Sequence, residues 1–158
     1  MGNRAVITTS VSLDKTGVYL HWNGGRASVE AFLAYCNLKG YRCPEDDCYG
    51  WAYLVGVITN TFASGISVGI DSCLDLDTDN YDNGTYIIEN WLITDRMFMD
   101  RSYEQDDYDL LESVKEIDGY QPERMRLTEE QWKRFDTVKQ ATIDARAKCN
   151  YITNNDGE

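Results

Sequence analysis

A change in the spacing of apolar residues at a double glycine, residues 24–25, constrains the fold of this chain more than any other feature. Residues 5–11 and 18–22 before it are rich in β-branched and aromatic residues, which predicts two strands, and the turn-forming residues 14–17 predict that they pair as a hairpin. Apolar residues after it recur at helical spacing: Val29, Phe32, Leu33 and Cys36. Strands and helices therefore belong to one fold.

The following segments continue this alternation. We predict that Ser28 caps the first helix and Gly40 ends it. A second helix is expected to start near Pro44 and to be the most buried helix, because its apolar stripe is wide. Alternating residues 66–71 predict a third strand, and a fourth is expected from residue 86 to residue 93 or as far as residue 99.

Two short motifs place the remaining elements. Asn83-Gly84 predicts a hairpin turn before the fourth strand. Residues 110–117 have the apolar spacing of a short helix, and Thr128 followed by Gln131 forms a capping box at the start of the last helix.

The resulting fold class is α+β, with a mostly antiparallel sheet of order ββααββ, two packed helices and a helical C-terminal extension. We expect an α+β core domain over residues 1–99, a helical extension over residues 100–152 packed on that core, and a disordered tail over residues 153–158.

Negative charge is concentrated in the middle of the chain, whose net charge is -12. Residues 44–118 hold eighteen acids and three bases, residues 1–43 hold two acids and five bases, and residues 119–158 hold seven of each. Such a field repels nucleic-acid phosphates and attracts basic protein surfaces, so we expect no direct nucleic-acid binding.

The five cysteines predict reduced thiols. Their odd number without a secretion signal, and the absence of a long apolar segment, favour a cytoplasmic protein with no membrane contact. No zinc-type ligand spacing is present, so we expect neither a metal nor a cofactor.

The turn after the second strand has three interpretations. The double glycine and the helix N-terminus can hold a nucleotide-like anion, can form a purely structural turn, or can belong to a small enzyme that uses His21 as a base. The ligand-binding residues of the first interpretation are His21, Trp22, Asn23, Gly24, Gly25 and Arg26.

Two acidic segments are candidate partner-binding surfaces. The loop of residues 75–84 can be a partner-binding surface, a weak Ca²⁺ site or a solvated loop. Its alternating aspartates resemble the start of an EF-hand loop, but the glycine and the glutamate that such a loop requires are missing. Residues 103–109 interleave aromatics with carboxylates, as a nucleic-acid mimic would, or form a solvated connector. The partner-binding residues are expected to be Asp75, Asp77, Asp79, Asp82, Tyr103, Asp106, Asp107, Tyr108 and Asp109.

Residues 17–24, GVYLHWNG, followed by an amphipathic helix, resemble a family of small uncharacterised phage and mobile-element proteins. Those proteins carry a strand that ends in His, an aromatic residue, Asn or Asp, and Gly. The resemblance covers residues 3–95, and the family has no established activity from which a catalytic residue could be carried over. It implies an accessory protein acting in the cytoplasm of a bacterial host, a setting in which small acidic proteins inhibit defence systems.

The resemblance and the charge pattern together predict a non-catalytic anti-defence inhibitor, of the anti-CRISPR or anti-restriction kind. Its acidic middle would block the basic, nucleic-acid-binding surface of a host protein. An anion-binding protein and an enzyme based on His21 are the two alternatives.

Overall fold

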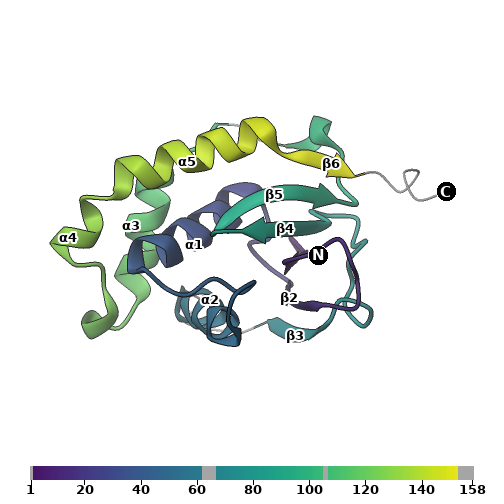
Figure 1. The fold of residues 1–158 in the computed structure, drawn as a ribbon, viewed down its shortest axis with the longest axis horizontal. Helices are drawn as coiled ribbons and strands as arrows, with labels where there is room; N and C mark the ends of the chain where they lie inside the picture. The colour runs from purple at the N-terminus through teal and green to yellow at the C-terminus, as the bar shows by residue number, and fades with distance from the viewer. Residues whose placement is uncertain (1, 62–66, 105–106, 153–158) are drawn as a thin grey trace.

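A six-stranded mixed sheet forms the centre of the computed structural model, which describes residues 2–61, 67–104 and 107–152 (Figure 1). The strand order is β3-β2-β1-β4-β5-β6. The strands are β1 (Ala5–Thr8), β2 (Thr16–Leu20), β3 (Val68–Ser72), β4 (Thr85–Glu89), β5 (Leu92–Met97) and β6 (Asn150–Ile152). The pairs β1–β2, β2–β3 and β4–β5 are antiparallel, whereas β1–β4 and β5–β6 are parallel. The α+β class and the β1–β2 hairpin are thus confirmed, but the sheet is mixed.

Helices cover one face of this sheet (Figure 1). They are α1 (Arg26–Lys39), α2 (Cys48–Thr61), α3 (Leu110–Tyr120), α4 (Glu129–Trp132) and α5 (Phe135–Lys148). Of two 3₁₀ turns, η1 (Arg101–Tyr103) lies between β5 and α3, and η2 (Glu123–Met125) lies between α3 and α4. Helix α1 packs against α3, α2, α5 and β5, so it lies at the centre of the molecule. None of the described helices combines the length and the apolar character that a membrane span requires.

The opposite face of the sheet is covered in part by the loop that leads from β3 to β4. Cys73 in this loop is buried, and a Cβ atom added to Gly17 in β2 would lie only 2.6 Å from its Sγ. The Thr85 hydroxyl in turn donates to the Thr78 carbonyl oxygen at 3.0 Å. The acidic loop is therefore held on the face of the sheet that the helices leave open.

The ends of the helices follow local sequence signals in most places. Gly40 ends α1 with φ 72°, and Thr128 and Gln131 form the predicted capping box of α4. Two predicted starts are wrong: Gly25 rather than Ser28 is the N-cap of α1, and α2 begins at Cys48, four residues after Pro44.

Three further predictions are corrected. The expected fourth strand is two strands, β4 and β5, joined at Asn90 and Trp91, both of which have positive φ. Asn83-Gly84 leads into β4 rather than joining a hairpin, because Val6 in the parallel strand β1 donates to the Gly84 carbonyl oxygen. Helix α1, not α2, is the most buried helix.

The C-terminal segment is built into the same sheet and core. It supplies β6, which pairs with β5, and the helices that pack on α1. The expected tail of residues 153–158 lies outside the described residues.

Candidate functional site

The two glycines have different roles: Gly24 is required by close packing, and Gly25 lies at the uncapped N-terminus of α1. Gly24 donates from its N–H to the Asn3 carbonyl oxygen at 2.8 Å and accepts from the Tyr86 hydroxyl at 2.7 Å. A Cβ on Gly24 would lie 2.6 Å from that Asn3 oxygen, so the close approach requires glycine. Gly25 is the N-cap of α1 and supplies no capping side chain.

Beneath this helix end lies a buried ion cluster, defined as Arg26, Glu30, Arg96, Glu104 and Arg146. Arg26 lies 3.6 Å from a carboxylate oxygen of Glu30 and 3.6 Å from one of Glu104. Arg96 also pairs with Glu104, and Arg146 pairs with Glu30 at 2.8 Å. Three guanidinium groups and two carboxylates give these five side chains one net positive charge.

Tyrosines surround this cluster. The Tyr108 hydroxyl donates to Glu30 at 2.7 Å, Arg26 donates to the Tyr151 hydroxyl at 2.8 Å, and the Arg96 guanidinium lies 3.9 Å from the centre of the Tyr86 ring. Burial, followed by the negative charge of Glu30, raises the pKa of Tyr108, and burial lowers the pKa of Arg96.

Arg26 and Arg96 both have buried N–H groups without a hydrogen bond, and of the two only Arg26 lines a cavity described below. Only 4% of Arg26 is exposed, and its Nε and Nη2 atoms form no hydrogen bond within the described residues, although Nε lies 3.6 Å from a Glu30 carboxylate oxygen. Burial opposes its charge, but attraction led by Glu30 outweighs that effect and raises its pKa. A buried donor without an acceptor costs roughly 1–3 kcal/mol, and more when it is charged, so an added acceptor at this position is favourable.

A cavity of about 350 Å³ lies at this end of α1, and we call it the arginine cavity. It is lined by Asn3, Gly25, Arg26, Ala27, Ser28, Asn83, Met99 and Glu104. The N-terminal turn of α1 and the Arg26 side chain therefore line the same space.

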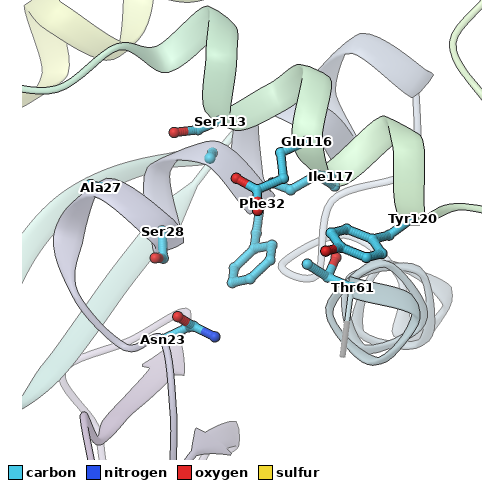
Figure 2. A pocket seen from close by; sticks show the side chains of 10 residues that line it. Asn23, Ala27, Ser28, Phe32, Thr61, Ser113, Glu116, Ile117 and Tyr120 are labelled. Atoms are coloured by element: carbon cyan, nitrogen blue, oxygen red, sulfur yellow. The ribbon is translucent and has the colours of Figure 1, made fainter. Parts of the chain in front are cut away.

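A second cavity, of about 210 Å³, lies on the other side of the first turn of α1, and we call it the hydroxyl cavity. It is lined by Asn23, Ala27, Ser28, Ala31, Phe32, Thr61, Ser113, Glu116, Ile117 and Tyr120. Figure 2 shows Asn23 and Ser28 on one side, Thr61 and Tyr120 on the other, and the Phe32 ring between them. Ala27 and Ser28 line both cavities, so the two are adjacent.

The six residues of the predicted turn site are thus separated by the fold. Gly25 and Arg26 line the arginine cavity and Asn23 lines the hydroxyl cavity. His21 and Trp22 line neither: the His21 ring accepts or donates a hydrogen bond at the Tyr19 hydroxyl, 2.9 Å away, and packs edge-on against Trp22. The enzyme alternative stays a prediction without further support from this geometry.

The aspartates of the 75–84 loop differ in their contacts. Asp75, Asp77 and Asp79 are exposed, whereas Asp82 is half-buried and accepts from Arg4 Nε at 2.7 Å. This hydrogen bond lowers the pKa of Asp82. Arg4 also pairs with Asp77 at 3.5 Å, so one base offsets part of the charge of the loop.

The 103–109 segment contributes mainly to the structure where it is described. Tyr108 binds the buried Glu30, Asp109 caps α3 by accepting from the Glu112 N–H, and Asp107 is exposed. Asp106 and the side chain of Tyr103 lie outside the described part of the chain.

The described aspartates of the 75–84 loop do not form a cluster of potential metal ligands. Within residues 2–61, 67–104 and 107–152, three potential ligand atoms come within 4.8 Å of one another only at Cys43, Glu45 and Asp46. Glu45 there already accepts from the Asn90 N–H at 2.7 Å, which ties the loop between α1 and α2 to the β4–β5 turn. The five cysteines are free thiols, of which Cys48 is exposed.

Several site residues were not predicted from the sequence. Asn3, Asn83, Met99 and Glu104 reach the arginine cavity from segments far from the double glycine, and no local pattern marks them. The spacing of Arg26 and Glu30, one helical turn apart, was the available signal for the buried pair.

Comparison with protein-family models, with curated proteins and with solved structures found no match to this chain, so a functional assignment depends on the chemistry of the two cavities and of the acidic loop.

Proposed function

We propose that this protein binds a small phosphate-like anion in the arginine cavity. The observation that supports this most is Arg26, a buried guanidinium in the cavity wall whose Nη2 atom has no acceptor and whose Nε lies 3.6 Å from Glu30, beyond hydrogen-bond distance. Guanidinium groups bind phosphate and carboxylate through paired N–H donors, so the unused donors match an oxyanion.

The helix end adds a second favourable contribution. The N–H groups of the first turn have no acceptor within the helix, and Gly25 provides no side chain to cap them. The first turn also contains no acidic residue that would compete for the positive end of the helix dipole. Both features favour an anion at Arg26, Ala27 and Ser28.

A single charge change in the first turn tests this proposal. Ser28→Asp places a carboxylate in the third helical position, where it stabilises the helix dipole but repels a second anion. Thr137→Asp is the matched control, because Thr137 is the third residue of α5 and is exposed. Isothermal titration with inorganic phosphate is the measurement.

We expect wild type and Thr137→Asp to bind phosphate equally and Ser28→Asp to bind it at least about tenfold more weakly, a difference of about 1.4 kcal/mol. Equal phosphate binding by all three proteins, or none by wild type at millimolar phosphate, contradicts the proposal.

The exposed aspartates support a second candidate function, the anti-defence inhibitor. Asp75, Asp77 and Asp79 are exposed around a loop that also presents Tyr81, of which 91% is exposed. An exposed aromatic among carboxylates suits a basic protein surface, such as the nucleic-acid-binding surface of a host protein.

Charge reversal and salt test this second candidate. After capture of a partner from host lysate, reversal of Asp75, Asp77 and Asp79 to Lys should slow association and weaken its salt dependence. Reversal of Glu129 and Glu130, in the charge-balanced part of the chain, is the control. Equal effects of both sets would attribute binding to net charge and exclude this loop as the site.

A further inference from the structure

The hydroxyl cavity carries polar side chains that the fold itself does not use. Within the described part of the chain, Asn23, Ser28, Ser113, Glu116 and Tyr120 form no side-chain hydrogen bond or ion pair; Ser28 and Ser113 are half-buried and the other three are exposed. They come from the turn before α1, from α1 and from α3, and they face one space (Figure 2).

The chemistry of this set matches a ring that carries several hydroxyl groups. A carboxylate accepts from hydroxyl donors, an amide both donates and accepts, and serine and tyrosine hydroxyls do the same. The half-buried positions of Ser28 and Ser113 and the apolar contact of Phe32 provide a surface against which such a ring can pack.

The position of the hydroxyl cavity relates it to the arginine cavity. Ala27 and Ser28 belong to both walls, so a molecule that crosses the first turn of α1 can occupy both spaces. The anionic group would lie at Arg26 and the hydroxylated ring between Ser28, Glu116 and Tyr120.

We infer that the ligand is the phosphate monoester of a polyhydroxylated ring, a sugar phosphate, with its ring in the hydroxyl cavity. This inference rests on the proposed function, because the phosphate occupies the anion site. A free sugar phosphate and a nucleotide share this ribose-phosphate chemistry, so the test includes both.

Titration with four probes separates the two sites: inorganic phosphate, ribose, ribose 5-phosphate and adenosine 5′-monophosphate. We expect ribose 5-phosphate to bind wild type at least about tenfold more tightly than phosphate, an increment typical of a few added hydrogen bonds. Amide resonances of Asn23, Ser113 and Tyr120 should shift together with those of residues 25–28. Tighter binding of the nucleotide than of ribose 5-phosphate would identify the nucleotide as the source.

Two variants in α3 test the ring site without touching the anion site. Ser113→Ala and Glu116→Gln should reduce ribose 5-phosphate affinity to that of phosphate and leave phosphate affinity unchanged. Glu112→Gln, on the same helix but outside both cavities, should change neither.

The possible failures are distinct. If phosphate and ribose 5-phosphate bind with equal affinity, and only the amide resonances of residues 25–28 shift, the sugar-phosphate inference is wrong but the anion site stands. No response to either probe would overturn the inference and the proposed function together.

Discussion

At the scale of single residues, buried charge is the unusual property of this protein. Arg96 is fully buried, and Arg26 and Glu30 are each 4% exposed. Removing such groups from water costs several kcal/mol per ion unless partners replace the water. Glu30 has its partners in Arg146 and Tyr108, and Arg96 has the Tyr86 ring and the Asn83 carbonyl oxygen.

Buried tyrosines predict a loss of stability at alkaline pH. Burial raises the pKa of Tyr35 and of Tyr86 above the ordinary value of 10.0, with a further contribution from Asp118 at Tyr35. Above pH 10 the unfolded chain therefore releases protons that the folded chain retains, so the free energy of unfolding falls by up to about 1.4 kcal/mol per pH unit for each group.

Urea unfolding at pH 8 to 11 measures this effect. Tyr35→Phe, which lacks the ionisable hydroxyl, should be less stable than wild type at pH 8 because Asp118 loses its donor at 2.8 Å. Its decline with pH should nevertheless be shallower. Parallel declines in both proteins would show that Tyr35 does not contribute.

At the scale of elements, α1 connects the core with both cavities. Its apolar positions were predicted from their spacing, as was its end at Gly40, because both signals are local. The near-complete burial of α1 was not predicted, since charged residues such as Arg26 and Glu30 are almost never fully buried unless they are paired. Only the long-range contacts with Glu104 and Arg146 show that these charges lie inside.

The β4–β5 hairpin illustrates the same limit. Asn90 and Trp91 adopt φ of 53° and 62°; asparagine is common at such positions, but tryptophan is not, so the local turn signal is weak. The turn is held by tertiary contacts: the Trp91 Nε1–H donates to the Tyr41 carbonyl oxygen and the Asn90 N–H to Glu45. The parallel pairing of β1 with β4 likewise depends on a crossover that local patterns do not specify.

A substitution at each end of α1 separates helix stability from anion binding. Gly25→Ser adds a capping hydroxyl where space is open, since a Cβ there meets only Asn3 Nδ2, at 3.5 Å. It should stabilise the protein by a few tenths of a kcal/mol and weaken phosphate binding, because the hydroxyl takes a free N–H.

Gly40→Ala should show a different combination of effects. Its φ of 72° costs an alanine about 1 kcal/mol, although nothing lies within 4 Å of the added Cβ, and phosphate binding should not change. Urea midpoints and phosphate titrations of both variants check this, and unchanged phosphate affinity in Gly25→Ser would argue against the helix end as the anion site.

At the scale of the whole molecule, the C-terminal third completes the core. Leu110, Val114 and Ile117 of α3 and Phe135 and Val138 of α5 belong to the same buried apolar cluster as α1. Strand β6 extends the sheet beside β5. The sequence predicted these helices but not how fully they enter the core.

A fragment of residues 1–99 should therefore fail to fold cooperatively. It would leave the α3-facing side of α1 uncovered and the charges of Arg26 and Glu30 without Glu104 and Arg146. Circular dichroism during urea titration should show no sharp transition for the fragment and one for the full chain. A cooperative transition in the fragment would mean that residues 1–99 form an independent domain.

The anion site in the arginine cavity is the central claim, and a ¹⁵N-edited NMR titration of the wild-type protein with inorganic phosphate at constant ionic strength tests it most directly. Saturable shifts of the Arg26, Ala27 and Ser28 amides and of the Arg26 Nε–H, with smaller shifts elsewhere, are the predicted result. Shifts that do not saturate and that spread over exposed bases such as Lys15 and Lys139, with residues 25–28 unmoved, would contradict it.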